Sequence, residues 1–350
     1  MSDDITKKEH YVPQCYLRNF AIADNPEKIH VFDKTKVQIR RNQNILDNAQ
    51  ERYFYEIDID KILAETSEEN RAAIMKQLGL DYAIIRNDKT QYIEKLFAEE
   101  LEGGYSQLLK DIIDKACSAT PWYISNCYCM RKEQQIAFSI YLSVQYLRTR
   151  KTRNMIEEGY TKLYETLFRK IYNQRCEDEK LKLKPGDVTF TVGKEALKIP
   201  HAEMMLNVDA ILDLSAAFLN HIWVIYINNT EIPFWTSDSP IVLNNMSSGI
   251  MANKGITSKG IEIYLPLSGR VCLALYDRDV YERAFLLKTL WFTDRFYLNA
   301  SKKIVERCNK IQVKECNRCV YAETDDFSVA EKMCIDDPLL MEKKEYFDIG

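Results

Sequence analysis

Several features that define enzyme classes are missing from this chain of 350 residues. It has no Gly-rich phosphate loop, no dinucleotide-binding fingerprint, no His-Glu-x-x-His motif and no Gly-x-Ser-x-Gly nucleophile elbow. Only four histidines are present, so a metal site made of several imidazoles is hard to build. These absences argue against P-loop chemistry, a serine triad and metalloprotease activity.

Long apolar runs and an excess of basic residues are also lacking. No apolar stretch approaches the ~18 residues of a membrane span, and residues 1–8 are polar, with no apolar signal region. The net charge of −4 gives the molecule no overall attraction to nucleic acid or to an anionic membrane, although a local basic groove stays open. We therefore expect a cytoplasmic globular protein that makes no membrane contact.

The ten cysteines are scattered without regular spacing. Cys127 and Cys129, together with Cys316 and Cys319, offer four thiolates, but Cys-x-Cys is irregular for zinc and the pairs are far apart in sequence. Free, reduced thiols are the better interpretation, and we expect no zinc. A divalent cation held by carboxylates and a histidine stays open, although no spacing demands one.

The pattern along the chain predicts one integrated mixed α+β domain. An N-terminal motif and β-hairpin arm (1–60) precede a helical region (61–176) and an α/β region (188–323), and a polar tail follows (324–350). Strands are expected over 28–33 and 37–41, with a third extended piece over 52–57. Three further segments, 221–227, 261–265 and 271–276, are apolar on both faces, as in the central strands of a sheet.

One long helix is expected from about 131 to 173. Its first half is apolar on all sides, which predicts burial all round, and its second half is amphipathic. Gln145, Arg148 and Arg153 follow the apolar half, and polar groups at the end of a buried helix must find partners or water. This requirement is the physical reason for placing a site at that end of the helix.

The segment from His10 to Phe20, His-Tyr-Val-Pro-Gln-Cys-Tyr-Leu-Arg-Asn-Phe, carries the strongest candidate chemistry. The proline is suited to the first position of a helix, and Gln14 and Arg18 would then share one helical face. His10 precedes the helix at its positive end, so an imidazole, an amide and a guanidinium gather where anions bind readily. His10 is the candidate general acid or base, and the alternative is a histidine that anchors the arm.

Asp238 lies in Thr-Ser-Asp-Ser-Pro after an apolar strand, a common place for a catalytic acid. The same pattern also forms an Asx-turn, in which the carboxylate binds nearby backbone N–H groups, and the two interpretations are balanced. Arg148, with Arg153 as a weaker candidate, would hold a phosphate or carboxylate, although a structural ion pair is the favoured alternative for any one arginine. Glu102 is a weaker acidic candidate on a helix.

These segments resemble the DUF4238 family, a bacterial family of unknown function. The resemblance rests on the His10–Phe20 segment and on five later segments in the same order, over about residues 9 to 320. The later segments are Ile-His-Val-Phe-Asp-Lys (29–34), residues 51–55, Gln-Tyr-Leu-Arg-Thr (145–149), Thr-Ser-Asp-Ser-Pro (236–240) and Tyr-Leu-Pro-Leu-Ser (264–268). The chain departs from the expected pattern at Gly269, where a proline would follow Pro-Leu-Ser.

Two functions follow as hypotheses. The first is a nuclease-like hydrolase that acts on a phosphodiester or another anionic substrate, with His10 and Asp238 as catalytic residues and Gln14, Arg18, Gln145 and Arg148 as substrate ligands. The family's bacterial setting makes a defence or toxin-like role conceivable. The alternative is a non-catalytic binding or interaction module with a structural His/Arg/Asp network. Burial and mutual satisfaction of these side chains favour the second hypothesis, and convergence on an open pocket favours the first.

Overall fold

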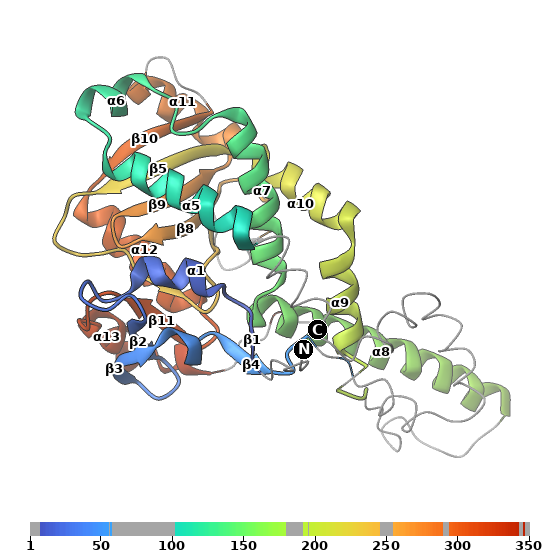
Figure 1. Cartoon of the computed structure of the whole chain (residues 1–350). Helices are drawn as coiled ribbons and strands as arrows, with labels where there is room; N and C mark the ends of the chain where they lie inside the picture. Colours follow the sequence, from blue (N-terminus) through green and yellow to red (C-terminus); the bar gives the residue numbers. More distant parts are fainter. Residues whose placement is uncertain are drawn as a thin grey trace, which may run out of the picture.

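The structure is a computed structural model that describes residues 8–55, 57, 102–179, 192–194, 196–245, 255–289, 294–342 and 346. It is a mixed α+β fold with N-terminal strands, a helical middle and a C-terminal mixed sheet (Figure 1). The helices are α1 (Gln14–Leu17), α5 (Glu102–Cys117), α6 (Pro121–Asn126), α7 (Lys132–Leu147), α8 (Arg150–Glu179), α9 (Lys198–Leu206), α10 (Val208–Leu219), α11 (Arg278–Thr289), α12 (Lys302–Glu315) and α13 (Ser328–Asp336).

The strands of the described part form three sheets. The largest has the order β10-β5-β9-β8-β7, in which only β10 and β5 are parallel, and the second has the order β3-β2-β11-β6. A short ribbon joins β1 to β4. The strands are β1 (Lys8–His10), β2 (Lys28–Asp33), β3 (Gln38–Asn44), β4 (Gln50–Arg52), β5 (Ile222–Asn228), β6 (Thr236–Ser237), β7 (Val242–Asn245), β8 (Ile261–Ser268), β9 (Val271–Tyr276), β10 (Arg295–Ala300) and β11 (Cys319–Ala322).

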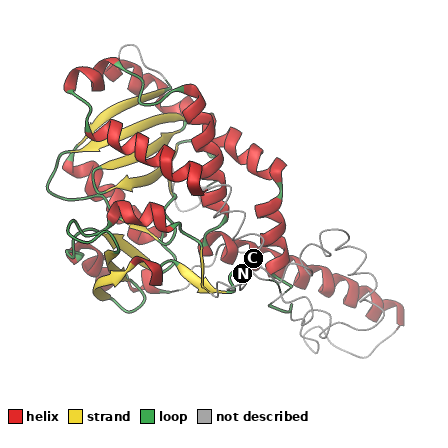
Figure 2. Cartoon of the chain, viewed as in Figure 1, coloured by secondary structure: helices red, strands yellow, loops and turns green. Residues whose placement is uncertain are grey.

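The five-stranded sheet is covered on both faces, as the red helices around the yellow strands show (Figure 2). On one face, Trp223 and Ile225 pack with Phe138 of α7 and Phe218 of α10. On the other face, alternate residues of the same strands pack against α11 and α12. The expectation of central strands apolar on both faces is confirmed, because side chains of a strand point alternately to its two faces and both are buried here.

The expected hairpin is confirmed as β2 and β3, which pair antiparallel. The third extended piece is shorter and earlier than 52–57, because β4 ends at Arg52 and pairs with β1 instead of the hairpin. β2 instead takes β11 as its second neighbour, and β11 in turn pairs with β6. The N-terminal hairpin is therefore part of a sheet completed by two strands from the last third of the chain.

The single long helix expected over 131–173 is wrong, because α7 ends at Leu147 and α8 begins at Arg150. Thr149 separates them, and its Oγ1 accepts a hydrogen bond from the backbone N–H of Thr152 at 3.3 Å, as a helix N-cap does. Burial of α7 on all sides is also wrong, since Ile136 is exposed. Three residues of the amphipathic stripe on α8 are exposed as well: Leu163, Leu167 and Ile171.

The segment expected as a loosely packed tail contains α13 and contributes to the core. Phe327, Ala330 and Cys334 are buried against Phe32 and Trp235. The sequence of this segment is polar on average, but these three residues share the buried face, whereas Val329 and Ile335 of α13 are exposed. Residues 61–101 of the expected helical region lie outside the described residues, as do residues 180–187 between this region and the expected α/β region.

The β8–β9 turn contains Gly269 at the position where the resemblance predicts proline. A Cβ atom built on Gly269 would lie 2.5 Å from Oε1 of Glu323, so the flexible end of that side chain would have to shift. The carbonyl oxygen of Gly269 accepts hydrogen bonds from the backbone N–H of Phe234 and from the side chain of Asn228. Three segments of the chain therefore meet at this turn.

Candidate functional site

The N-terminal arm lies against the end of α7, and polar side chains make the contact. Arg148 donates from Nη2 to the carbonyl oxygen of His10 at 2.6 Å, and from Nε to the hydroxyl of Tyr55 at 3.3 Å. Gln145 donates from Nε2 to the carbonyl oxygen of Tyr11 at 3.2 Å. Both side chains are buried. Two of the expected substrate ligands thus bind backbone carbonyl groups of the arm.

His10 is buried in β1, and its Nε2 lies 3.2 Å from the carbonyl oxygen of Leu46. Because a carbonyl only accepts, this contact places the proton of the neutral ring on Nε2 and leaves Nδ1 unprotonated. Burial lowers the pKa of His10 to about 4, and the positive charge of Arg148 acts in the same direction. The imidazole is therefore neutral at physiological pH.

Arg153 occupies a similar position one turn into α8. It donates from Nη1 to the carbonyl oxygen of Phe54 and pairs through Nε with Glu157 at 2.7 Å. Its guanidinium also lies 4.6 Å from the centre of the Phe54 ring. The ring of His201 packs edge-on against the Phe54 ring, with the ring centres 6.0 Å apart, and its Nε2 is 2.8 Å from the carbonyl oxygen of Leu147. Arg153 is thus fully engaged within the chain.

Asp238 binds the connection between α12 and β11. Its Oδ1 accepts the backbone N–H of Asn317 at 2.8 Å, and its Oδ2 accepts those of Arg318 and Cys319 at 2.7 and 2.9 Å. Burial raises the pKa of Asp238, and the three amides and the charge of Lys34 oppose that rise. This geometry matches the interpretation in which the carboxylate of Asp238 binds backbone N–H groups. The amides that it binds lie about 80 residues away in the sequence, not in the same turn.

Lys34 is a residue that the sequence reasoning missed. It is 1% exposed, and its Nζ donates to the carbonyl oxygen of Cys316 at 2.5 Å, at the negative end of α12. The preceding residue, Asp33, forms an ion pair with Arg318 at 2.6 Å. The available signal was Asp33-Lys34 at the end of the early strand, since a charged pair directly after apolar residues must be solvated or paired. Lys34 and Asp238 therefore hold the same connection from its carbonyl and amide sides.

Gln14 and Arg18 are not brought into this network. Arg18 is exposed and pairs with Glu27 at 3.0 Å, while Gln14 accepts from Arg18 at 3.4 Å. The two side chains therefore contact each other and Glu27, not the backbone of the N-terminal arm. Glu102 is the first residue of α5, and its side chain lies outside the described part.

Arg40 on β3 has a different environment from these engaged arginines. Its Nη2 donates to the Sγ of Cys319 at 3.7 Å, and its Nε is buried without a hydrogen-bond partner. Its positive charge opposes the rise in pKa that burial causes for Cys319 and Tyr321. Tyr11 is close to the same groups, because its negative form would raise the pKa of Tyr321 as well. We call Arg40, Tyr11, Cys319 and Tyr321 the Arg40 site.

Further arginines surround the Arg40 site. The charge of Arg150 lowers the pKa of Tyr11, although burial raises it overall. Arg318, whose partner is Asp33, interacts electrostatically with Tyr11 and Cys319. Arg150 is paired with Glu51 at 3.3 Å. The charges of Arg40, Arg150 and Arg318 thus each act on Tyr11 or Cys319, and Arg40 has no ion pair with any residue of the described ranges.

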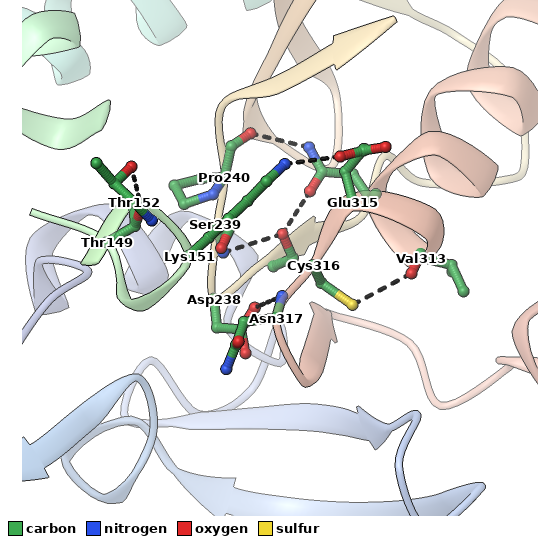
Figure 3. Close-up of polar contacts among 12 residues, drawn as sticks. Thr149, Lys151, Thr152, Asp238, Ser239, Pro240, Val313, Glu315, Cys316 and Asn317 are labelled. Atoms are coloured by element: carbon green, nitrogen blue, oxygen red, sulfur yellow. Dashed lines mark hydrogen bonds and ion pairs between the residues drawn. The ribbon is translucent and has the colours of Figure 1, made fainter. Parts of the chain in front are cut away.

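A small cavity lies beside the same turn, between the start of α8 and the residues after Asp238 (Figure 3). It is lined by Tyr146, Thr149, Lys151, Thr152, Met155, Ser239 and Ile241. Ser239 is 1% exposed, and its Oγ has no hydrogen-bond partner. Lys151 pairs with Glu315 of α12 at 2.6 Å. We call this space the Ser239 cavity.

No group of three or more His, Cys, Asp or Glu side chains is arranged to hold a metal ion among the described residues. The backbone N–H of Cys319 binds Asp238, whereas the carbonyl oxygen of Cys129 accepts from the hydroxyl of Tyr297. Within the same ranges, no helix has both the length and the apolar character that crossing a bilayer requires.

A protein-family model covers most of the chain. The chain belongs to the DUF4238 family, described as "Protein of unknown function", and the family model matches residues 8–326. Comparison with curated proteins and with solved structures gives no match. The family assignment therefore adds no activity to the geometry.

Proposed function

We propose that this protein is a binding module for a phosphate-bearing ligand, that the ligand binds at the Arg40 site, and that the His/Arg/Asp network holds this site together. One observation carries the proposal: the guanidinium of Arg40 keeps a buried Nε–H without an acceptor. A buried donor without a partner costs about 1–3 kcal/mol, so a ligand oxygen that accepts from it gains binding energy. Guanidinium suits phosphate because it presents a planar fork of donors.

The hydrogen bonds of the other expected ligand residues support a structural role for these residues. Arg148, Gln145 and Asp238 bind backbone groups of the chain itself. Redirecting them to a ligand would leave buried carbonyl or amide groups unpaired, which is unfavourable. The module would therefore recognise its ligand without moving this network.

A calorimetric titration with inorganic phosphate tests the proposal. Arg40→Gln removes the charge and the fork, and we expect its affinity to fall about ten- to a hundredfold, which corresponds to the ~1.5–3 kcal/mol of a charge-assisted hydrogen bond. Arg41→Gln is the matched control, because Arg41 is the neighbouring residue and pairs with Asp325 at the exposed surface. Equal affinity of Arg40→Gln and wild type would contradict the proposal.

Hydrolysis of a phosphodiester is a second candidate, and the fixed tautomer of His10 favours it. Nδ1 carries a lone pair that receives no hydrogen bond from a side chain of the described part, so a substrate proton is an available partner. Incubation with bis(p-nitrophenyl) phosphate distinguishes the two candidates. The binding module predicts no turnover, whereas the hydrolase predicts turnover that is lost in His10→Gln and persists down to about pH 5, because the pKa of His10 is about 4.

A further inference from the structure

The Ser239 cavity shares no lining residue with the Arg40 site. The cavity has a volume of about 10 Å³, which limits it to one small occupant. Met155, Ile241 and the ring of Tyr146 form much of its wall. The hydroxyl of Ser239 is the buried polar group that lacks a partner there. An occupant must therefore be small, accept a hydrogen bond and tolerate apolar walls.

The threonine hydroxyls of the cavity are already engaged. Thr149 and Thr152 both donate to the carbonyl oxygen of Tyr146, at 3.2 and 2.6 Å. Thr149 also accepts the backbone N–H of Thr152. Because these hydroxyl protons point to the carbonyl group, the hydroxyl of Ser239 is left as the donor without a partner among the groups that line the cavity.

The positive end of helix α8, which adjoins the cavity, favours an anion. The cavity lies at the N-terminus of α8, a helix of 30 residues, where the macrodipole is positive. The first turn carries no acidic residue and three basic ones: Arg150, Lys151 and Arg153. Cations are unfavourable at this end of a helix. Each of the three forms an ion pair with a carboxylate elsewhere, and the partner of Lys151 is Glu315.

We propose that the Ser239 cavity is a binding site for one halide-sized monovalent anion. Ser239 donates to the anion, the start of α8 and the ammonium of Lys151 stabilise its charge, and the apolar walls suit a weakly hydrated ion. The carboxylate of Asp238 faces the amides of residues 317–319 and is neutralised there, while Glu315 is neutralised by Lys151. The anion would link α8 to the turn after β6 and so stabilise the region where these elements meet.

Bromide is the probe that tests this site. Thermal melting is measured in sodium bromide and in sodium gluconate at the same ionic strength, because gluconate is too large for the cavity. We expect the melting temperature of the wild type to rise with bromide concentration relative to gluconate. Ser239→Ala should lose this rise, whereas Ser143→Ala should retain it, since Ser143 is a buried serine of α7 that bonds to the carbonyl oxygen of Ser139.

Crystals grown in bromide give an independent readout, the anomalous signal of the ion. The expected result is one anomalous peak within hydrogen-bond distance of Oγ of Ser239, and no such peak in Ser239→Ala. An empty cavity, or density without anomalous signal that indicates water, would overturn the proposal. An equal bromide effect in Ser239→Ala and wild type would overturn it as well, because the stabilisation would then come from elsewhere. Neither result depends on phosphate binding at Arg40.

Discussion

Arg148 on the last turn of α7 donates to the carbonyl oxygen of His10 at 2.6 Å, and this bond joins two family segments that are 138 positions apart in the chain. The guanidinium binds the backbone of the segment that begins with His10, and the imidazole binds the backbone of Leu46. Both side chains are buried. The two residues therefore position the N-terminal arm, and the predictions below follow from that role.

Substitution of Arg148 should destabilise the fold. Arg148→Ala leaves a buried carbonyl and a buried hydroxyl with fewer partners, and we expect a loss of about 2–3 kcal/mol in the free energy of unfolding. Arg148→Lys keeps one donor and the charge, so it should lose less. Urea unfolding of the two variants measures both values. A wild-type midpoint for Arg148→Ala would show that the arm is held by other contacts.

Lys34 should be among the most sensitive positions of the β2–β3 hairpin. Lys34→Met fills similar space but leaves the carbonyl oxygen of Cys316 unpaired and removes the positive charge near Asp238. Removal of one member of a buried charged group typically costs ~3–5 kcal/mol. Lys36→Met is the matched control, since Lys36 is exposed two residues later. Equal unfolding midpoints for the two variants would contradict the role assigned to Lys34.

Two buried histidines should make the protein less stable in mild acid. Burial lowers the pKa of His10 and of His201 to about 4, below the unfolded value of about 6.5. Between these values the unfolded chain binds more protons than the folded chain, so stability falls as the pH is lowered from 6.5 towards 4. Each histidine should contribute a loss of about 2 kcal/mol between pH 6.5 and 5.

Urea unfolding at pH 7.5 and at pH 5 measures this dependence. The double variant His10→Gln, His201→Gln keeps a donor at each site but cannot titrate, so its stability should change less between the two pH values than that of the wild type. Parallel losses in both proteins would assign the acid sensitivity to other groups.

Arg18 should be tolerant of substitution. Its partner Glu27 is about half exposed, and ion pairs of this kind contribute ~0.2–1 kcal/mol. Arg18→Ala and Arg18→Lys should therefore lie close to the wild type in stability and in phosphate affinity. A large loss of affinity in both variants would restore the phosphate-ligand role that the sequence suggested for Arg18.

The sequence predicted the order of the helices and strands better than it predicted the hydrogen-bond partners of their polar residues. The hairpin of β2 and β3 and the buried strands β5, β8 and β9 follow from local patterns of apolar residues. The break at Thr149 escaped prediction, because the apolar pattern continues past it and the N-cap depends on one hydroxyl. Local periodicity carries no information on such single contacts.

The partners of the candidate residues were beyond sequence reasoning for another physical reason. Asp238 was expected to bind nearby amides or a ligand, and it binds amides about 80 residues away. Those contacts depend on how α12 and β11 are placed, which no single segment specifies. Arg40 and Lys34 were missed because a charged residue beside a strand is ordinarily exposed, and only tertiary packing buries it.

A paired measurement on Asp238→Asn tests the central claim, that the family segments build the scaffold and Arg40 contacts the ligand. The new amide group brings donors against backbone N–H groups, so the free energy of unfolding should fall by about 3 kcal/mol. The phosphate affinity, measured by calorimetry where the variant is fully folded, should match that of the wild type. Unchanged stability together with lost phosphate affinity would contradict the account and make Asp238 part of the ligand site.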